Sequence, residues 1–256
     1  MSKLDQAIEA KKGKPLIGAA VGSYNPTFLE IIAELGYDSV WIEMEHQFIT
    51  FAQAEDLCRI ASGLGLLTMI RIPDSRRENV LKAAECGPDI IDLPMCNTVE
   101  VVEEFVLHAR YAPEGRRGFY GSSRAVRYSS GDIVEEQRRI NRELCLMAQI
   151  ETAEAIERLD ELLAVKGIGA VLIGPGDLSA SLGVPGEVGD ASVENAIGRI
   201  IDGARSAGKR VAIAINPTYA RRWIERGADL VYCVGDVSAM RLGAKTMLDR
   251  VLSSLS

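Results

Sequence analysis

The stretch LIGAAVGSYNPTFLEIIAELGYDSVWIE, residues 16–43, contains one complete strand–helix–strand pattern. Its two ends, Leu16–Val21 and Ser39–Glu43, are short apolar runs of the kind found in strands that are covered on both faces. Between them, Pro26 stands in the first turn of a helical pattern and Gly36 follows its end. The stretch therefore predicts two parallel strands joined by a helix.

The same pattern continues along the rest of the chain. Six further strand candidates follow: Leu67–Ile72, Asp89–Pro94, Leu144–Ile150, Ala170–Gly174, Arg210–Ile215 and Leu230–Val234. One long helical pattern, Glu151–Gly167, separates the fifth candidate from the sixth. About eight such units in about 250 residues predict a single-domain (β/α)8 TIM barrel over residues 1–256.

A doubly wound open sheet is the alternative to the barrel. Such a sheet commonly carries a Gly-x-Gly-x-x-Gly turn after a strand, and the nearest segment, Gly174–Gly183, lacks the third glycine. Length alone allows one large domain or two small ones. Since no linker, repeat or low-complexity tract divides the chain, we expect one α/β barrel.

Composition limits the classes of partner. The 256 residues are 47% hydrophobic and 25% charged, and the net charge is −7, so we expect neither a nucleic acid nor a membrane as partner. The N-terminus has no apolar signal segment, and no apolar run approaches the length of a membrane span. Five scattered cysteines without a Cys-x-x-Cys pair indicate reduced thiols. The sequence predicts a cytoplasmic protein that acts on small molecules.

Polar residues collect where the predicted strands end. The second strand runs into Glu43, Glu45 and His46. The ends of later strands add Arg71, Gln149, Glu151, Asp177, Asn216 and Asp236. Because the active sites of such barrels lie at the carboxyl ends of the strands, these residues predict an active site.

Each of these residues also has a simpler interpretation. His46 could cap a loop, and Arg71 could close a salt bridge instead of holding an anion. Glu151 and Asp177 could each belong to the start of a helix. If both are site residues, two carboxylates from neighbouring loops suit Mg²⁺ or Mn²⁺ better than zinc. No lysine is expected inside the barrel, which disfavours imine chemistry.

Several motifs together resemble one known family. They are GYDSVWIEMEH, IRIPD, LPMCNTVE, RRGFYGSSRAVRY and, most specifically, LMAQIETAEAIERLDELLAVKGIGAVLIGPGDLSASLG. The chain resembles the HpcH/HpaI-type class II pyruvate aldolases nearly from end to end. The resemblance implies that Glu151 and Asp177 bind a divalent metal, which would be Mg²⁺, Mn²⁺ or Co²⁺. It also implies that Gln149 and the backbone around Gly176 and Asp177 hold pyruvate.

The resemblance further assigns the residues that take part in the reaction. Arg71 would steady the carbonyl oxygen as negative charge develops on it, which is where fixed positive groups help most. His46 would act as the base, and imidazole suits proton transfer near neutral pH. Glu43 or Glu85 would orient His46.

Three features depart from the family pattern. Glu43 and Glu85 stand where the family has aspartate, and Ala20 stands where an aromatic residue is common. An extra methylene changes reach by roughly 1 Å, which can matter greatly to rate. Arg124 and Arg127 lie in the arginine-bearing loop of the family, where they could meet an acidic aldehyde, solvent or another subunit. The pyruvate half of the site is expected to be conventional, while the aldehyde stays open.

The resemblance implies a carbon–carbon lyase that reversibly cleaves a 4-hydroxy-2-oxo acid into pyruvate and an aldehyde, in aromatic or sugar acid catabolism. Two alternatives stay open: a CoA-ester lyase of the citrate-lyase beta type, and a non-catalytic barrel that binds 2-oxo acids. The resemblance also implies a homohexamer, a trimer of dimers that exchange the C-terminal helix, residues 237–255. The alternative is that this amphipathic helix packs on its own barrel.

Overall fold

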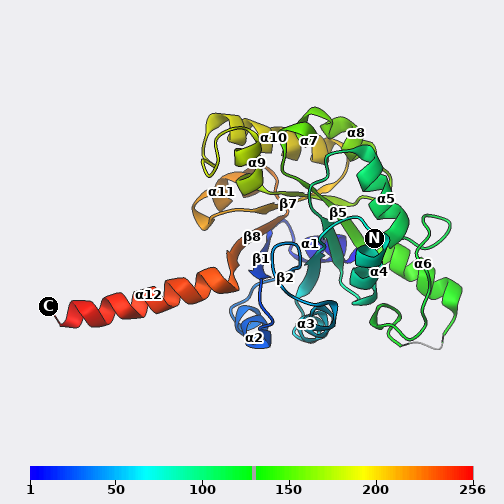
Figure 1. Cartoon of the computed structure of the whole chain (residues 1–256), viewed down its shortest axis with the longest axis horizontal. Coiled ribbons are helices and arrows are strands. Elements are labelled where there is room, and N and C mark those ends of the chain that lie inside the picture. Colours follow the sequence, from blue (N-terminus) through cyan, green and yellow to red (C-terminus); the bar gives the residue numbers. More distant parts are fainter. Residues whose placement is uncertain (129–130, 256) are drawn as a thin grey trace.

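The structure, a computed structural model, describes residues 1–128 and 131–255, and eight parallel strands close into a barrel at its centre (Figure 1). The strands are β1 Leu16–Val21, β2 Ser39–Glu43, β3 Leu67–Arg71, β4 Ile90–Leu93, β5 Cys145–Ile150, β6 Ala170–Ile173, β7 Arg210–Ala214 and β8 Leu230–Gly235. They pair in chain order, and β8 closes on β1. The predicted TIM barrel is confirmed, and the doubly wound alternative is excluded.

Helices surround the barrel and connect its strands. They are α1 Lys3–Ala10, α2 Pro26–Glu34, α3 Phe51–Gly63, α4 Arg77–Glu85, α5 Val99–Ala109, η1 (a 3₁₀ turn) Arg124–Val126, α6 Ile133–Glu143, α7 Ala153–Glu157, α8 Leu159–Ala164, α9 Pro175–Ser181, α10 Ala191–Ser206, α11 Pro217–Arg226 and α12 Asp236–Ser254. The prediction of one helix over Glu151–Gly167 is wrong. The backbone leaves the helical conformation at Arg158 (φ −101°, ψ 14°), which divides the segment into α7 and α8.

Two apolar layers hold the barrel together. The inner layer consists of side chains that point into the barrel, among them Met69 and Met147, and Leu4 of α1 joins it from the end where the strands begin. The outer layer lies between strands and helices. Gly18 is needed for the inner packing, because a Cβ there would lie 2.4 Å from the ring of Tyr232. Hydrophobic burial thus fixes the strand ends that carry the site.

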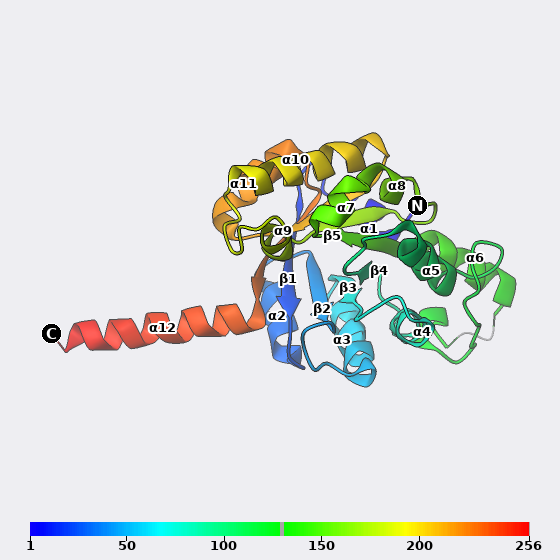
Figure 2. The same ribbon diagram turned by 45° about the horizontal axis from the view of Figure 1, so that its top comes forward.

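The last helix, α12, extends away from the barrel as a rod (Figures 1 and 2). Its first residue, Asp236, is buried and accepts hydrogen bonds from the backbone N–H groups of Gly22 and Ser23 at 3.1 Å each. Beyond that residue, seven large apolar side chains of α12 are more than half exposed. Among the helices that the structure describes, none has both the length and the apolar character of a membrane span.

Candidate active site

Three neighbouring strands place charged side chains side by side at their carboxyl ends. Glu43 of β2 is in register with Arg71 of β3, and Arg71 is in register with Asp92 of β4. In a parallel sheet, residues in register on adjacent strands face the same side. All three are at least 90% buried, so the charges meet in a dry environment.

The guanidinium of Arg71 is the positive centre of this group. Its Nε and Nη2 atoms each lie 2.6 Å from Oε2 of Glu43, and its Nη1 lies 3.1 Å from Oε2 of Glu45. The guanidinium also lies over the indole of Trp41, with Cζ 4.7 Å from the ring centroid. Arginine presents its donors in a rigid fork, so these contacts fix its orientation. The salt-bridge interpretation of Arg71 is therefore correct, and it is compatible with anion binding through the remaining N–H groups.

Glu43 does more than pair with arginine. Its Oε1 accepts hydrogen bonds from the backbone N–H groups of Glu45 at 2.8 Å and His46 at 2.9 Å. One buried carboxylate thus holds both Arg71 and the loop that carries the histidine. The sequence predicted that Glu43 orients His46, and the contact observed is with the backbone of His46 and not with its ring.

The ring of His46 stands at the mouth of the barrel. Its side chain is 61% exposed, and Nε2 lies 3.4 Å from Oε2 of Glu45. Burial raises the pKa of Glu45, and the positive charges of Arg71 and His46 oppose that rise. Glu45 therefore links the arginine to the histidine, a role that the sequence did not assign to it.

A second group of polar side chains follows β5. Oε1 of Glu151 accepts the backbone N–H of Met95 at 2.9 Å, and Oε2 accepts a hydrogen bond from the amide of Gln149. Met95 donates from a left-handed backbone conformation (φ 53°), which is costly for a residue other than glycine. Burial raises the pKa of Glu151, the hydrogen bonds from Met95 and Gln149 oppose the rise, and the negative charge of Asp177 adds to it.

Asp177 and Gly176 lie in the first turn of α9, directly after β6, and both are exposed. A Cβ on Gly176 would meet nothing within 4 Å, so the backbone at this turn is open to a ligand. Gly174 is different, since a Cβ there would lie 2.6 Å from Oε2 of Glu151. The predicted set of Gln149, Glu151, Gly176 and Asp177 therefore belongs to one corner of the barrel mouth.

The donor chemistry of this corner fits a hard divalent cation. Glu151 and Asp177 are close enough for the charge of Asp177 to raise the pKa of Glu151, so a cation between them would relieve that repulsion. The amide oxygen of Gln149 is buried and has no hydrogen-bond partner in residues 1–128 and 131–255. No cluster of three or more His, Cys, Asp or Glu side chains with metal-binding geometry occurs among those residues. Two carboxylates with open positions suit Mg²⁺ or Mn²⁺, which keep water and substrate oxygens as ligands.

Glu85 is the one predicted site residue that the chain does not bring to this mouth. It ends α4, and its Oε1 accepts a hydrogen bond from Nη2 of Arg117 at 2.8 Å. Among the described residues, no hydrogen bond or ion pair joins Glu85 to His46 or Arg71. Its predicted role of orienting His46 thus has no support within one chain. Arg124 likewise points to α3, where it bonds to the carbonyl of Cys58.

Asp92 is a site residue that the sequence analysis missed. It is fully buried, and neither of its carboxylate oxygens has a hydrogen-bond partner in the part of the chain that the structure describes. Burial raises the pKa of Asp92 well above its ordinary value, Arg71 opposes the rise, and Glu151, Glu43 and Glu45 add to it. The only signal in the sequence was a charged residue within an otherwise apolar strand, two positions after Ile90.

Other polar residues at strand ends have structural roles. Asn216 caps α11 by accepting the N–H of Thr218 at 3.0 Å, and Asp236 holds the loop after β1. His108, on α5, contacts the carbonyl of Ser75 at 3.1 Å. The chemistry is therefore concentrated on β2 to β6.

Together, the fold and the site define a (β/α)8 barrel with a buried guanidinium, that of Arg71, beside two carboxylates, Glu151 and Asp177, whose chemistry suits a divalent cation. The model of the HpcH/HpaI aldolase/citrate lyase family matches residues 17–238, and the chain belongs to this family. The membership confirms the family predicted from the sequence, together with the enzyme class that it implies, a carbon–carbon lyase.

Comparison with individual relatives supports this family assignment. The 2-keto-3-deoxy-L-rhamnonate aldolase of Klebsiella pneumoniae is 34% identical over 222 residues, which cover 86% of this chain and 82% of the relative. The crystal structure of an HpcH/HpaI aldolase from Desulfitobacterium hafniense superposes with a TM-score of 0.89 at 29% identity, over 95% of each chain. The citrate synthase SbnG shares the fold, with a TM-score of 0.87 over 98% of this chain and 99% of that one, but only 22% identity.

Proposed function

We propose that this protein is a divalent-metal-dependent aldolase that reversibly cleaves a 4-hydroxy-2-oxo acid into pyruvate and an aldehyde. The observation that supports this most strongly is the fixed guanidinium of Arg71, which lies near enough to Glu151 to oppose the rise of its pKa. A positive group and a metal-type carboxylate pair at one barrel mouth suit a reaction in which an oxygen gains negative charge.

Glu151 and Asp177 would hold the cation, which supplies Lewis-acid polarisation of the 2-oxo group. The chain provides the remaining contacts. The amide of Gln149 and the open backbone at Gly176 bind the oxo acid. Arg71 has N–H groups that are not bonded to Glu43 or Glu45, and these face the 2-oxo oxygen. Because the carboxylates already fix the guanidinium, little reorganisation is needed when charge develops.

His46 moves the proton. In the cleavage direction it takes the proton of the 4-hydroxyl group, the C3–C4 bond breaks, and C4 becomes the aldehyde carbon. The electron pair of that bond passes to the pyruvate half, where Arg71 stabilises the charge. Glu45, 3.4 Å from Nε2 of His46, stabilises the imidazolium that forms. The imidazolium then gives that proton to C3 of the pyruvate half, which completes the methyl group of pyruvate and restores neutral His46; condensation runs through the same steps in reverse.

The relatives suggest the first substrate to assay. They are named 2-keto-3-deoxy-L-rhamnonate aldolases, which favours sugar acid over aromatic catabolism for this chain. Cleavage of that six-carbon acid by the same chemistry gives pyruvate and the three-carbon lactaldehyde. Glu43 and Ala20 differ from the family pattern, so we propose a panel of aldehydes in the condensation direction as well.

Exchange of the methyl protons of pyruvate in D₂O tests the proposal without an aldehyde. By ¹H NMR, we expect loss of the methyl signal only with protein and Mg²⁺, Mn²⁺ or Co²⁺, and no loss with EDTA. His46→Ala should abolish aldol turnover while Mn²⁺ binding is retained, because His46 is not a proposed ligand. Absence of exchange with every metal would favour the CoA-ester lyase. The same absence together with pyruvate binding that His46→Ala leaves unchanged would favour the non-catalytic barrel.

We also propose a homo-oligomer, a hexamer of three dimers that exchange α12. Support comes from α12 itself, which extends from the barrel with its apolar side chains exposed. The location in the cytoplasm stays a prediction from the sequence.

A further inference from the structure

A cavity of about 390 Å³ lies at the end of the barrel where the strands begin, opposite the candidate active site. Its walls come from the end of α3 at Ser62, the loop Gly87–Asp89 before β4, and the end of α6 with Leu144 before β5. Lys3 of α1 completes it. Its volume falls within the range of small-molecule sites, roughly 300–1,000 Å³. Nothing in the proposed aldolase chemistry uses this cavity.

The charges around the cavity contrast with those of the whole protein. Five basic side chains line it: Lys3, Arg117, Arg124, Arg127 and Arg139. Of the described residues, two acidic side chains, Asp89 and Glu143, line it with them. The net charge of the chain is −7, so this is a local concentration of positive charge on an acidic protein. Such a concentration attracts small anions.

Two of the arginines are already paired with carboxylates. Arg139 lies 2.7 Å from Glu136 and 3.0 Å from Glu143. The side chain of Arg117 is fully buried, and its Nη2 lies 2.8 Å from Oε1 of Glu85. Its guanidinium lies over the ring of Tyr111. Its Nε and Nη1 atoms still have no hydrogen-bond partner among the described residues.

The other three basic groups have no carboxylate partner within 4.0 Å in residues 1–128 and 131–255. Among the described residues, Arg124 bonds only to neutral acceptors, the carbonyl of Cys58 at 3.0 Å and the hydroxyl of Ser62 at 2.8 Å. Lys3 and Arg124 both lie near Asp89, because their charges oppose the rise of its pKa that burial causes. Asp89 itself accepts the N–H and hydroxyl of Thr68. The positive charge of the cavity is therefore not neutralised from within.

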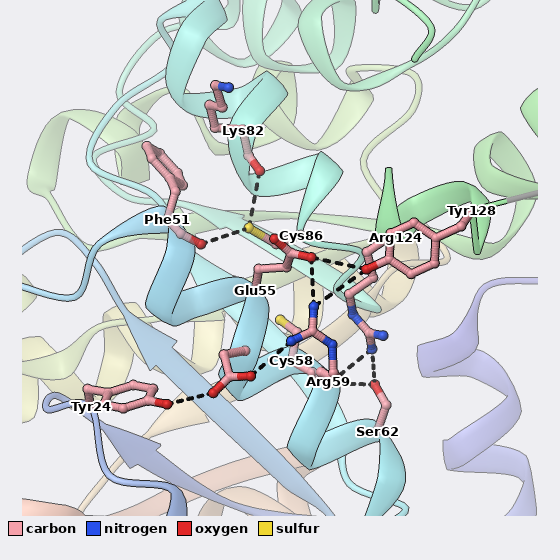
Figure 3. Close-up of polar contacts among 11 residues, drawn as sticks. Tyr24, Phe51, Glu55, Cys58, Arg59, Ser62, Lys82, Cys86, Arg124 and Tyr128 are labelled. Carbon is pink, nitrogen blue, oxygen red and sulfur yellow. Dashed lines mark hydrogen bonds and ion pairs between the residues drawn. The ribbon is translucent and has the colours of Figure 1, made fainter. Parts of the chain in front are cut away.

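The segment that carries these arginines is attached to the barrel. Figure 3 shows Arg124 and Tyr128 both reaching α3. The hydroxyl of Tyr128 donates to Glu55 at 3.2 Å, while Arg124 bonds two residues near the last turn of α3. Arg124 is thus positioned before any ligand arrives, and the segment that carries Arg127 is held at Tyr128, which lowers the cost of binding.

We propose that this cavity is a binding site for a small oxyanion, either inorganic phosphate or the phosphate group of a small metabolite, held by Lys3, Arg124 and Arg127. Arginine and lysine are the side chains that bind phosphate, through charge-assisted hydrogen bonds. The bound anion lies at the end of the barrel where the strands begin, and it fixes η1 and α1 against the ends of α3 and α6. The site is independent of the aldolase reaction.

Inorganic phosphate titrated into the metal-free full-length protein in EDTA, at constant ionic strength balanced with NaCl, tests this proposal. We expect saturable stabilisation in thermal unfolding and a matching isotherm by calorimetry. Arg124→Gln and Arg127→Gln should each weaken phosphate binding tenfold or more. A parallel titration with glycerol 3-phosphate distinguishes the two sources, since tighter binding of the monoester indicates a metabolite and equal or weaker binding indicates free phosphate.

Two control variants give the result its meaning. Arg221→Gln removes an exposed charge on α11 and should leave phosphate binding unchanged, as should Arg71→Gln at the other end of the barrel. Arg127 is exposed, so its variant stays informative if Arg124→Gln does not fold. A non-saturable response, an equal loss in Arg221→Gln, or loss in Arg71→Gln alone would overturn the proposal.

Discussion

At the scale of single residues, the position of Arg71 depends on carboxylates that do not need to touch a substrate. Glu43 bonds to two of its nitrogens and also to the backbone that carries Glu45 and His46. Breaking a buried ion pair by removing one charge usually costs more than the pair contributes, because the other charge is left uncompensated. Glu43 is therefore both a stabilising and a positioning residue.

Glu43→Gln tests this double role. In either orientation of the new amide, its NH₂ group would face donors, which are Nε and Nη2 of Arg71 or the backbone N–H groups of Glu45 and His46. We expect a loss of about 2–4 kcal/mol in the free energy of unfolding by urea titration, and a fall in kcat of tenfold or more with a smaller change in KM. Glu55→Gln, in an exposed pair with Arg59, is the control and should cost no more than about 1 kcal/mol. Equal effects of the two variants would contradict the assignment.

Asp92 leads to a prediction about pH. Its pKa in the folded protein is raised above the ordinary value of 3.8 by burial and by the negative charges of Glu151, Glu43 and Glu45, against the opposing charge of Arg71. Above that ordinary value the folded state therefore binds more protons than the unfolded state. The free energy of unfolding therefore falls as the pH rises from 3.8 towards the raised pKa of Asp92 in the folded protein.

Asp92→Asn cannot ionise, so it should lack this part of the fall. In urea unfolding of metal-free protein, we expect similar stability for the two proteins near pH 4, close to the ordinary pKa of 3.8. Near pH 8, the variant should be more stable by about 1 kcal/mol or more. A variant that is less stable at pH 8 would mean that Asp92 is ionised and well partnered in the folded protein.

Some of these residues could be predicted from the sequence and others could not, and the reason lies in their position along the strands. Arg71 and Glu151 were found because strand ends are where barrel sites form, and a charge there needs an explanation. Asp92 was missed because it lies inside its predicted strand, Asp89–Pro94, and site residues were expected only where the strands end. Its inward direction becomes evident only when β4 is placed in register with β3. Glu85 was assigned by resemblance alone, and the fold of one chain pairs it with Arg117 instead.

At the scale of elements, the junction between β6 and α9 shapes the metal-type corner. The strand ends at Ile173, Gly174 is the N-cap of the helix, Pro175 opens the helix, and Asp177 follows within its first turn. The carboxylate of Glu151 occupies the space that a side chain at position 174 would need. The close approach of backbone to carboxylate thus requires glycine at this point.

Gly174→Ala and Gly176→Ala form a matched pair for testing this junction. A Cβ at position 174 would lie 2.6 Å from Oε2 of Glu151 and 3.1 Å from Nε2 of Gln149, whereas one at 176 would meet nothing within 4 Å. We expect Gly174→Ala to weaken Mn²⁺ binding by about 10–100-fold, measured by calorimetry or EPR, because the new methyl group would displace Glu151 and the Gln149 amide that holds it. Gly176→Ala should bind Mn²⁺ as the wild type does. Equal affinity of the two variants would show that Glu151 can shift without loss.

Elements were predictable where local pattern determines them. Every strand lies within one residue of its predicted limits, because apolar runs bounded by turn residues are a strong local signal. The break at Arg158 was not predictable, since the apolar spacing of Glu151–Gly167 continues across it. Tertiary context can override such a pattern, and the pattern itself does not record it.

At the scale of the whole molecule, the interpretation of the last helix as packed on its own barrel is wrong. Asp236 fixes the start of α12 at the barrel rim, and the helix then leaves the barrel (Figure 2). The sequence showed that the helix is amphipathic but could not show its direction, which the contacts of Asp236 determine. A helix with so much exposed apolar surface needs a partner, and another copy of this chain is the one that the proposed oligomer supplies.

The oligomer gives the last prediction. Leu248 and Leu252 lie four residues apart on α12, 58% and 56% exposed, so they share one face of the helix. If partner chains cover that face, Leu248→Glu with Leu252→Glu would bury two charges in an apolar contact, and the assembly should dissociate. We expect light scattering after size-exclusion chromatography to give a hexamer for the wild type and a smaller species for the double variant, with far-UV circular dichroism unchanged. Arg250→Glu, at an exposed position between the two leucines, should stay hexameric. A double variant that remains a hexamer would show that α12 does not hold the subunits together, and the contacts between chains would then have to come from the barrel surface. A monomeric wild type would contradict the proposed oligomer itself.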